Sequence, residues 1–74
     1  MITSTALSSQ TLAAAIYDSV QEKLQLDFCD GNRYVYYEVA PVLFRSLLDA
    51  HSKGQFFNQH IRGRVPFAKT LPEL

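Results

Sequence analysis

Apolar and polar residues alternate in the middle of the chain, where they predict a β-hairpin. From Leu24 to Phe28 every second residue is apolar, which is the period of a strand with one buried face. The dipeptide Asp30-Gly31 follows and is typical of tight hairpin turns, whose central positions need positive φ. Residues 33–39 are rich in aromatic and β-branched side chains, which favours the returning strand.

A different spacing follows, with apolar residues three and four positions apart, and it predicts two helices. Pro41 suits the first turn of a helix, where its missing N–H costs nothing. The stripe of this first helix consists of Leu43, Phe44, Leu47, Leu48 and His51. We expect Gly54 to end this helix in the left-handed conformation. A shorter helix over 55–62 and a second stop at Gly63 complete the prediction.

The pattern before the hairpin is ambiguous. Over residues 11–17 a run of alanines favours a helix by propensity, whereas Leu12, Ala14 and Ile16 alternate as in a strand. Taken as a strand, this segment completes an α+β fold. The fold is a three-stranded antiparallel meander followed by one main helix and a short second helix (β-β-β-α-α'). The helix then covers one face of the sheet and leaves the other face open.

The length of 74 residues limits the chain to one small domain. We expect a flexible lead-in over 1–8, a single domain over 9–69 and a C-terminal tail over 70–74. Hydrophobic residues make up 47% of the chain and charged residues 19%, which is typical of a soluble globular domain and excludes general disorder. A domain this small is only marginally stable alone, and an open apolar face favours a homo-oligomer.

Cysteine usage and targeting signals indicate the compartment. Cys29 is the only cysteine, so the chain forms no internal disulfide. Residues 1–10 lack Lys and Arg, and nowhere do about 18 apolar residues run together. We therefore expect a cytoplasmic protein with neither a signal peptide nor a membrane span.

Two runs of residues form a specific combination. The first is Leu24-x-Leu26-x-Phe28, with Gly31 and then Tyr34-x-Tyr36-Tyr37-x-Val39-x-Pro41. The second is Leu47-Leu48-x-Ala50-x-Ser52-x-Gly54-x-Phe56-Phe57-Asn58-x-x-Ile61-Arg62-Gly63. Together they resemble the KTSC domain family, and the likeness extends from Ser9 to Lys69.

That family takes its name from an extension at the C-terminus of some lysyl-tRNA synthetases. It also occurs as small stand-alone proteins of bacteria and their phages. The resemblance implies that this chain is such a stand-alone copy, and the synthetase connection implies RNA binding.

Positive charge gathers in the C-terminal third of the chain. The seven Lys and Arg residues balance the seven Asp and Glu residues overall, but the last third, which includes Arg62, Arg64 and Lys69, is net positive. Arg62-Gly63-Arg64 places two guanidinium groups around an unshielded backbone amide, an arrangement that suits phosphate or carboxylate. The alternative is two solvated arginines beside a glycine that ends a helix.

The hairpin register decides which side of the sheet Tyr34 and Tyr36 occupy. A two-residue turn at Asp30-Gly31 places both tyrosines on the open face. There they form a stacking platform worth ~1–3 kcal/mol per base. A three-residue turn with a bulge reverses this and buries them. Tyrosines of the core or of a dimer interface are therefore the alternative.

The other polar residues form no recognisable catalytic or metal-binding motif. His51 and His60 lie on apolar stripes without the spacing of metal ligands, so we expect helix-packing histidines and no metal. The chain has no Gly-rich phosphate loop and no Ser or Cys elbow, so we expect neither catalysis nor a cofactor. Asn58 follows two aromatic residues and is expected to be a buried amide, with ligand contact as the alternative.

These observations leave three hypotheses. The favoured one is a non-catalytic module that binds a small nucleotide, and an oligomer of such modules would sequester a nucleotide signal. Its ligand-binding residues are Tyr34, Tyr36, Asn58, Arg62, Gly63, Arg64 and Lys69. The second hypothesis is a domain that binds single-stranded RNA or tRNA with the same groups, which zero net charge disfavours. The third is a protein-interaction module that docks through the open sheet face.

Overall fold

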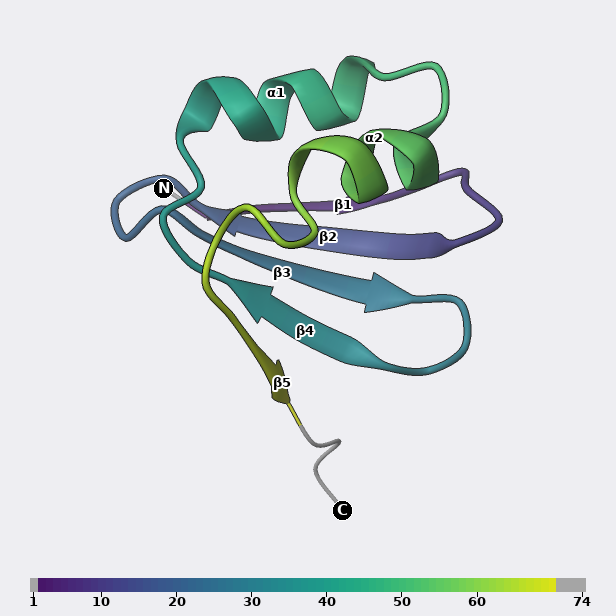
Figure 1. The fold of residues 1–74 in the computed structure, drawn as a ribbon, viewed down its shortest axis with the longest axis horizontal. Helices are drawn as coiled ribbons and strands as arrows, with labels where there is room; N and C mark the ends of the chain where they lie inside the picture. Colours follow the sequence, from purple (N-terminus) through teal and green to yellow (C-terminus); the bar gives the residue numbers. More distant parts are fainter. Residues whose placement is uncertain (1, 71–74) are drawn as a thin grey trace.

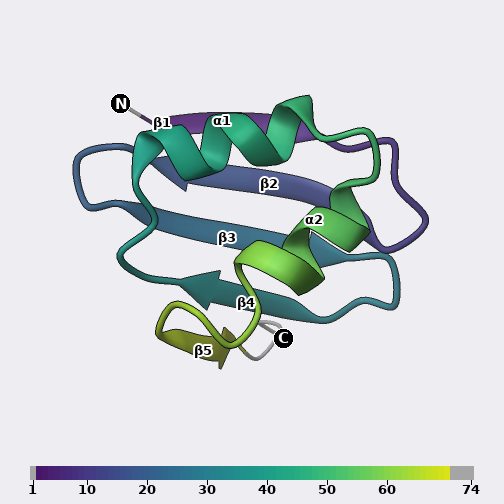
Figure 2. The ribbon, with the colours of Figure 1, turned by 45° about the horizontal axis from the view of Figure 1, so that its top comes forward.

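Five antiparallel strands form one sheet, and two helices cover one of its faces (Figure 1). The computed structural model describes residues 2–70. The elements are β1 (Ile2–Ala6), β2 (Leu12–Asp18), β3 (Lys23–Phe28), β4 (Arg33–Tyr36), α1 (Pro41–Asp49), α2 (Lys53–His60) and β5 (Phe67–Thr70). The strands lie side by side in chain order, although β5 joins β4 only after both helices (Figure 2). The predicted α+β class is confirmed, but the three-stranded meander omits a strand at each edge.

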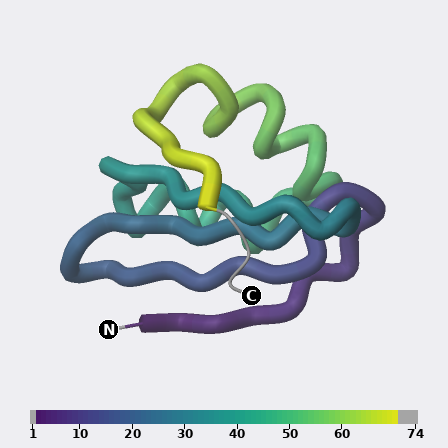
Figure 3. The backbone as a smooth tube through the Cα atoms, turned by 90° about the horizontal axis from the view of Figure 1, so that it is seen from below, coloured from purple at the N-terminus to yellow at the C-terminus, as the bar shows by residue number. Residues whose placement is uncertain are grey.

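Strand β1 lies in the segment that was expected to be a flexible lead-in. It pairs with β2 from Ile2 opposite Asp18 to Ala6 opposite Ala14, and it runs along one edge of the sheet (Figure 3). Ile2, Thr3 and Thr5 have β-branched side chains, which favour extended backbone. Pairing with β2 then makes this extended segment a strand.

Strand β5 forms the opposite edge. Pro66 precedes it, and its carbonyl accepts a hydrogen bond of 2.8 Å from the backbone N–H of the residue after β4. The pairing places Phe67 opposite Tyr36. Thr70, which was expected in the tail, therefore belongs to β5, and the rest of that tail lies outside the described residues.

The ambiguous segment before the hairpin is strand β2. It pairs with both β1 and β3, and the β3 register shifts between Leu12 and Ala14. Leu12 and Ala15 are fully buried. Pairing on both sides therefore outweighs the helix propensity of the three alanines.

The hairpin of β3 and β4 is confirmed, and of the two turns considered it has the three-residue one. The Phe28 N–H donates to the Asn32 carbonyl (2.8 Å), and the Gly31 N–H donates to the Phe28 carbonyl (3.0 Å). Gly31 has a φ of +94°, as such a turn with a bulge requires. The register is consequently shifted by one residue from that of a two-residue turn, with Tyr36 opposite Leu24 and Tyr34 opposite Leu26.

This register decides between the two alternative positions of the tyrosines. Leu24 and Leu26 are fully buried beneath the helices, so Tyr34 and Tyr36 face the helices and not the open side of the sheet. Tyr36 is buried and Tyr34 is half-buried.

The helices begin and end near the predicted positions, with one exception. Pro41 is in the first turn of α1 as predicted, and Gly63 has the expected positive φ (+76°) after α2. Gly54, expected to end the first helix, instead lies buried inside α2, because Ser52 caps that helix by accepting the Gln55 N–H (3.3 Å). A Cβ on Gly54 would stand 3.0 Å from Thr11 Oγ1, so this glycine allows α2 to approach the loop before β2.

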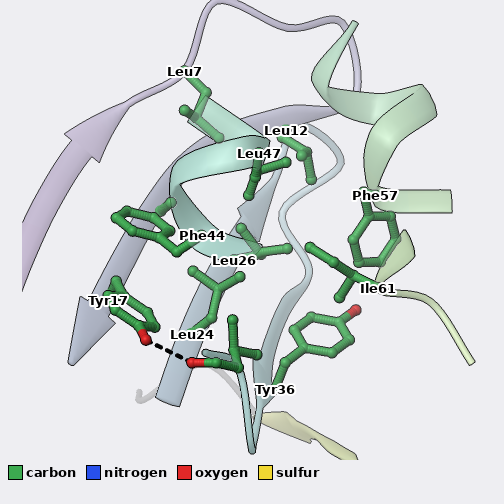
Figure 4. Packing of buried hydrophobic residues seen from close by; sticks show 12 residues of the cluster. Leu7, Leu12, Tyr17, Leu24, Leu26, Tyr36, Phe44, Leu47, Phe57 and Ile61 are labelled. Atoms are coloured by element: carbon green, nitrogen blue, oxygen red, sulfur yellow. Dashed lines mark hydrogen bonds between the residues drawn. The ribbon is translucent and has the colours of Figure 1, made fainter. Parts of the chain in front are cut away.

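The core fills the space between the sheet and the helices (Figure 4). Its fully buried large side chains are Leu12, Leu24, Leu26, Val39, Leu47 and Ile61. The Phe44 ring of α1 stacks on Tyr17, with 4.4 Å between the ring centroids. The Tyr17 hydroxyl donates to the Val39 carbonyl, so this buried polar group is satisfied.

We predict that Gly31→Ala lowers the free energy of unfolding by about 1–2 kcal/mol, the cost of placing a Cβ in a left-handed conformation. Apart from Gly31 and its two chain neighbours, no residue has an atom within 4 Å of the position that the Cβ would take, so backbone strain and not a clash is the cause. Urea denaturation measures the loss. Gly31→Asn is the control, because asparagine tolerates positive φ, and it should lose less. Equal stability of Gly31→Ala and the parent chain would show that the left-handed turn is not required.

The burial of Tyr36 also predicts that the free energy of unfolding decreases at alkaline pH. Burial raises the pKa of Tyr36 to about 12, from the ordinary value of 10.0. The unfolded chain therefore loses the Tyr36 proton before the folded chain does. Stability is fully present below pH 10 and decreases as the pH rises from 10 towards 12. Urea denaturation at a series of pH values should show this decrease, and Tyr36→Phe should make it smaller. An identical pH dependence in Tyr36→Phe would contradict the assignment.

Candidate binding cleft between helix α2 and the sheet edge

A cleft of about 400 Å³ opens between α2 and the edge of the sheet formed by β4 and β5. Five aromatic side chains form one part of its lining: Phe28, Tyr34, Tyr36, Phe57 and Phe67. Polar side chains form the rest: Thr11, Asp30, Asn32, Asn58 and Arg62. The lining therefore combines an apolar platform with groups that bind charge.

The five aromatic rings, which we call the aromatic cluster, touch one another in a closed circuit. Phe57 contacts Phe28 and Tyr36, with ring centroids 5.4 Å apart in both pairs. Tyr34 contacts Phe28 at 5.5 Å and Phe67 at 6.0 Å, and Phe67 contacts Tyr36 at 5.9 Å. These are distances at which aromatic pairs attract. Most rings therefore keep their places through mutual packing, while Phe67 remains 58% exposed.

Strand pairing explains how rings from distant parts of the sequence meet. The hairpin register places Tyr34 and Tyr36 on the helix side of β4. Pairing with β5 then places Phe67 beside Tyr36, across the strand boundary. Phe57, from the buried side of α2, closes the cluster from above the sheet, and Figure 4 shows it over Tyr36.

Arg62 provides the positive charge of the cleft. It follows α2, and its backbone N–H donates to the Phe57 carbonyl (2.9 Å). Its guanidinium reaches Asn58, with 3.5 Å between Nη1 and Oδ1. Arg62 also opposes the raised pKa of Tyr36, which desolvation by burial and neighbouring Tyr34 cause. The positive charge of Arg62 therefore acts on Tyr36, a buried ring of the aromatic cluster.

Asp30 and Asn32 form a second polar group in the cleft lining. The Asp30 carboxylate accepts hydrogen bonds from the Asn32 backbone (2.9 Å) and from its side-chain amide (3.0 Å). These bonds lower the pKa of Asp30. The carboxylate is therefore ionised at neutral pH, and the cleft holds one anionic and one cationic side chain.

The cleft brings together five of the seven predicted site residues. They are Tyr34, Tyr36, Asn58, Arg62 and Gly63. Of the two alternatives for the tyrosines, the structure has the one in which a three-residue turn places them on the helix side of the sheet. The expectation that Asn58 is a buried amide is wrong, since its side chain is exposed.

The other two predicted residues lie outside the cleft lining. Arg64 turns back to the helix, where its Nε donates to the Gln59 carbonyl (3.0 Å). The Lys69 ammonium lies 5.9 Å from the centre of the Tyr34 ring, at the edge of the aromatic cluster. Lys69 thus adds positive charge beside the cleft, while Arg64 stabilises the end of α2.

Sequence reasoning missed three of the aromatic residues. Phe28 was considered only as part of a strand, Phe57 only as part of the second run of family residues, and Phe67 was given no role in the site. Their aromatic character was visible in the sequence, but their meeting with the tyrosines depends on the pairing of β4 with β5.

Among residues 2–70 no group of three His, Cys, Asp or Glu side chains could hold a metal ion. In the same range no helix is long and apolar enough to span a membrane.

Comparisons with known proteins agree with this architecture. A protein of Tsukamurella paurometabola is 41% identical over 58 residues, which is 78% of this chain and 87% of that protein. A lysine–tRNA ligase of Nostoc punctiforme is 37% identical over 51 residues, which is 69% of this chain but only 9% of the ligase. The crystal structure of a KTSC domain protein from Yersinia pestis superposes with a TM-score of 0.89 at 26% identity, covering 95% of this chain and 99% of that one. The family model of the KTSC domain matches residues 8–65, and the chain therefore belongs to the KTSC domain family.

Proposed function

We propose that this chain is a non-catalytic binding module for a small nucleotide. The observation that carries the proposal is the meeting of an aromatic cluster and Arg62 in one cleft. A nucleotide has the same two parts, an aromatic base and an anionic phosphate. The cleft of about 400 Å³ also falls in the range of small-molecule sites, which is roughly 300–1,000 Å³.

Phe67 would stack on the base, and Tyr34, whose ring is inclined by 67° to that of Phe67, would contact the edge of the base. Tyr36 is buried and cannot offer a face to a ligand, whereas Tyr34 is half-buried and Phe67 is 58% exposed. Their ring centroids lie 6.0 Å apart. Stacking on an aromatic side chain such as phenylalanine or tyrosine contributes ~1–3 kcal/mol per base.

Arg62 would bind the phosphate. A guanidinium donates two parallel hydrogen bonds to phosphate oxygens. The next residue, Gly63, leaves open space where a Cβ would stand, so its backbone is accessible beside the guanidinium. Lys69, next to the Tyr34 ring, adds a second cation at the edge of the site.

Asp30, Asn32 and Asn58 would bind the polar edges of the ligand. The Asp30 carboxylate accepts hydrogen bonds from base amino groups and ribose hydroxyls, whereas the Asn32 and Asn58 amides can both donate and accept them. The carboxylate of Asp30 repels a ligand with many phosphates, and the chain has no net charge. These two features favour a single nucleotide over a long polyanion.

RNA binding is the second candidate, because this chain is similar to a segment of two lysine–tRNA ligases. A stretch of single-stranded RNA would use the same cleft for one nucleotide and Lys69 or Arg64 for neighbouring phosphates. Salt dependence separates the two, since each additional phosphate contact steepens the loss of affinity with salt.

The third hypothesis, a protein partner on the open sheet face, is less favoured. Tyr34 and Tyr36 face the helices, so they cannot contact such a partner.

We predict that Arg62→Ala weakens the binding of a nucleoside diphosphate by about tenfold or more, the equivalent of about 1.4 kcal/mol. Arg64→Ala is the matched control. It also removes one guanidinium group, two positions along the chain, but that group contacts the end of α2 and does not line the cleft. It should change affinity by less than about twofold, which is within the range of surface substitutions. Isothermal titration calorimetry with ADP, GDP, UDP and CDP measures both. If none of the four binds the parent chain, the proposed function is wrong.

We predict that Phe67→Leu also weakens nucleotide binding, by about fivefold or more, because it removes a stacking surface and keeps an apolar side chain. Phe67→Tyr keeps the aromatic face and should bind like the parent chain. Circular dichroism checks that each variant retains the sheet. Equal affinities of Phe67→Leu and Phe67→Tyr would show that Phe67 does not stack on the base.

A further inference from the structure

A second cavity, of about 610 Å³, adjoins the aromatic cleft. It lies between the loop of residues 8–11 and the segment 51–59, which includes most of α2. Thr11 and Asn58 line both cavities. The two cavities therefore form neighbouring parts of one surface, and we call the second one the polar groove.

The polar groove differs from the aromatic cleft in its chemistry. Hydroxyl and amide side chains dominate its lining, among them Ser8, Gln10, Thr11, Ser52, Gln55 and Gln59. The described lining includes no phenylalanine or tyrosine and no acidic side chain, and its charged or titratable groups are Lys53 and His51. Such a surface offers many hydrogen bonds, little positive charge and no platform for a second base.

The walls of the polar groove are held in place by the fold. Ser9 Oγ accepts the backbone N–H groups of Thr11 (3.1 Å) and Leu12 (3.2 Å), which fixes the loop before β2. Gly54 then allows α2 to approach this loop, since a Cβ there would stand 3.0 Å from Thr11 Oγ1. Because the backbone on both sides of the groove is fixed, a ligand would bind with little loss of backbone entropy.

Two glutamines of the polar groove are available to a ligand. Gln55 and Gln59 are four residues apart in α2, so their side chains lie on the same side of the helix. Both are exposed, and within residues 2–70 neither side-chain amide makes a hydrogen bond. Each can therefore donate to and accept from a hydroxyl group without breaking a contact of the fold.

Asn58 and Arg62 connect the two cavities. Asn58 lines both of them, and its Oδ1 lies 3.5 Å from the Arg62 guanidinium. A phosphate group on Arg62 would consequently lie near the boundary, between a base in the aromatic cleft and a group in the polar groove. That order of parts, aromatic base, anionic linker and hydroxyl-rich end, is the order in a nucleotide sugar.

We propose that the polar groove is a sugar subsite and that the ligand class is a nucleoside diphosphate carrying a pentose or hexose. This inference rests on the proposed nucleotide-binding function and adds the sugar subsite to it. A dinucleotide fits less well, because the groove offers its second base no aromatic surface. A longer polyphosphate fits less well, because the groove adds only Lys53 and His51 to the charge of Arg62.

Matched pairs of ligands test this inference by isothermal titration calorimetry. The pairs are ADP with ADP-ribose, GDP with GDP-mannose, and UDP with UDP-glucose, at equal ionic strength. In the pair whose base the cleft accepts, the sugar nucleotide should bind the parent chain at least about tenfold more tightly than the diphosphate. Equal affinities within a pair that binds would overturn the sugar subsite and leave the proposed function intact, whereas the absence of binding by every ligand would overturn both.

Variants locate the effect. The double variant Gln55→Ala and Gln59→Ala should remove the tenfold advantage of the sugar nucleotide and leave the affinity for the diphosphate within about twofold. Gln21→Ala, an exposed glutamine in the turn between β2 and β3, is the control and should keep the advantage. An advantage that survives in the double variant would overturn the assignment of the sugar to this groove.

Discussion

The turn between β3 and β4 is the constraint on which the candidate site depends. Because side chains alternate along a strand, one residue more or less in this turn exchanges the two faces of β4. The bulged turn at Gly31 gives the register that pairs Tyr34 with Leu26. β5 then takes its own register from β4, so the position of Phe67 follows from the same turn. A single glycine with positive φ thus determines whether five aromatic rings can meet.

Local signals predicted the elements more reliably than their arrangement. The hairpin, the start of α1 at Pro41 and the turn at Gly63 each depend on a few consecutive residues, and these predictions are confirmed. The register of the hairpin was left between two turn types, because Asp30-Gly31 suits both. Strands β1 and β5 were missed, because short polar or proline-flanked segments become strands only when a neighbouring strand supplies hydrogen bonds.

The candidate site shows the same division. Arg62 and Gly63 were found from charge and turn chemistry, which are local, and the tyrosines were found from their spacing. Phe67 joins them through the pairing of β5 with β4, two strands that both helices separate in the sequence. No local sequence pattern indicates that contact. Gly54 is a comparable case: its sequence position suggested a helix end, but the close approach of Thr11 explains it, and that approach is a property of the assembled fold.

The aromatic cluster serves stability and binding with the same rings, and this has a consequence for the molecule. Tyr36 and Phe57 are buried and belong to the core, whereas Phe67 is 58% exposed on a four-residue edge strand. A monomer of this size has little apolar surface to spare, so an exposed phenylalanine is a cost unless something covers it. A base stacked on Phe67 would extend the core outward across β5. Binding and the stability of this edge would then be linked, since a ligand that binds only the folded chain stabilises it.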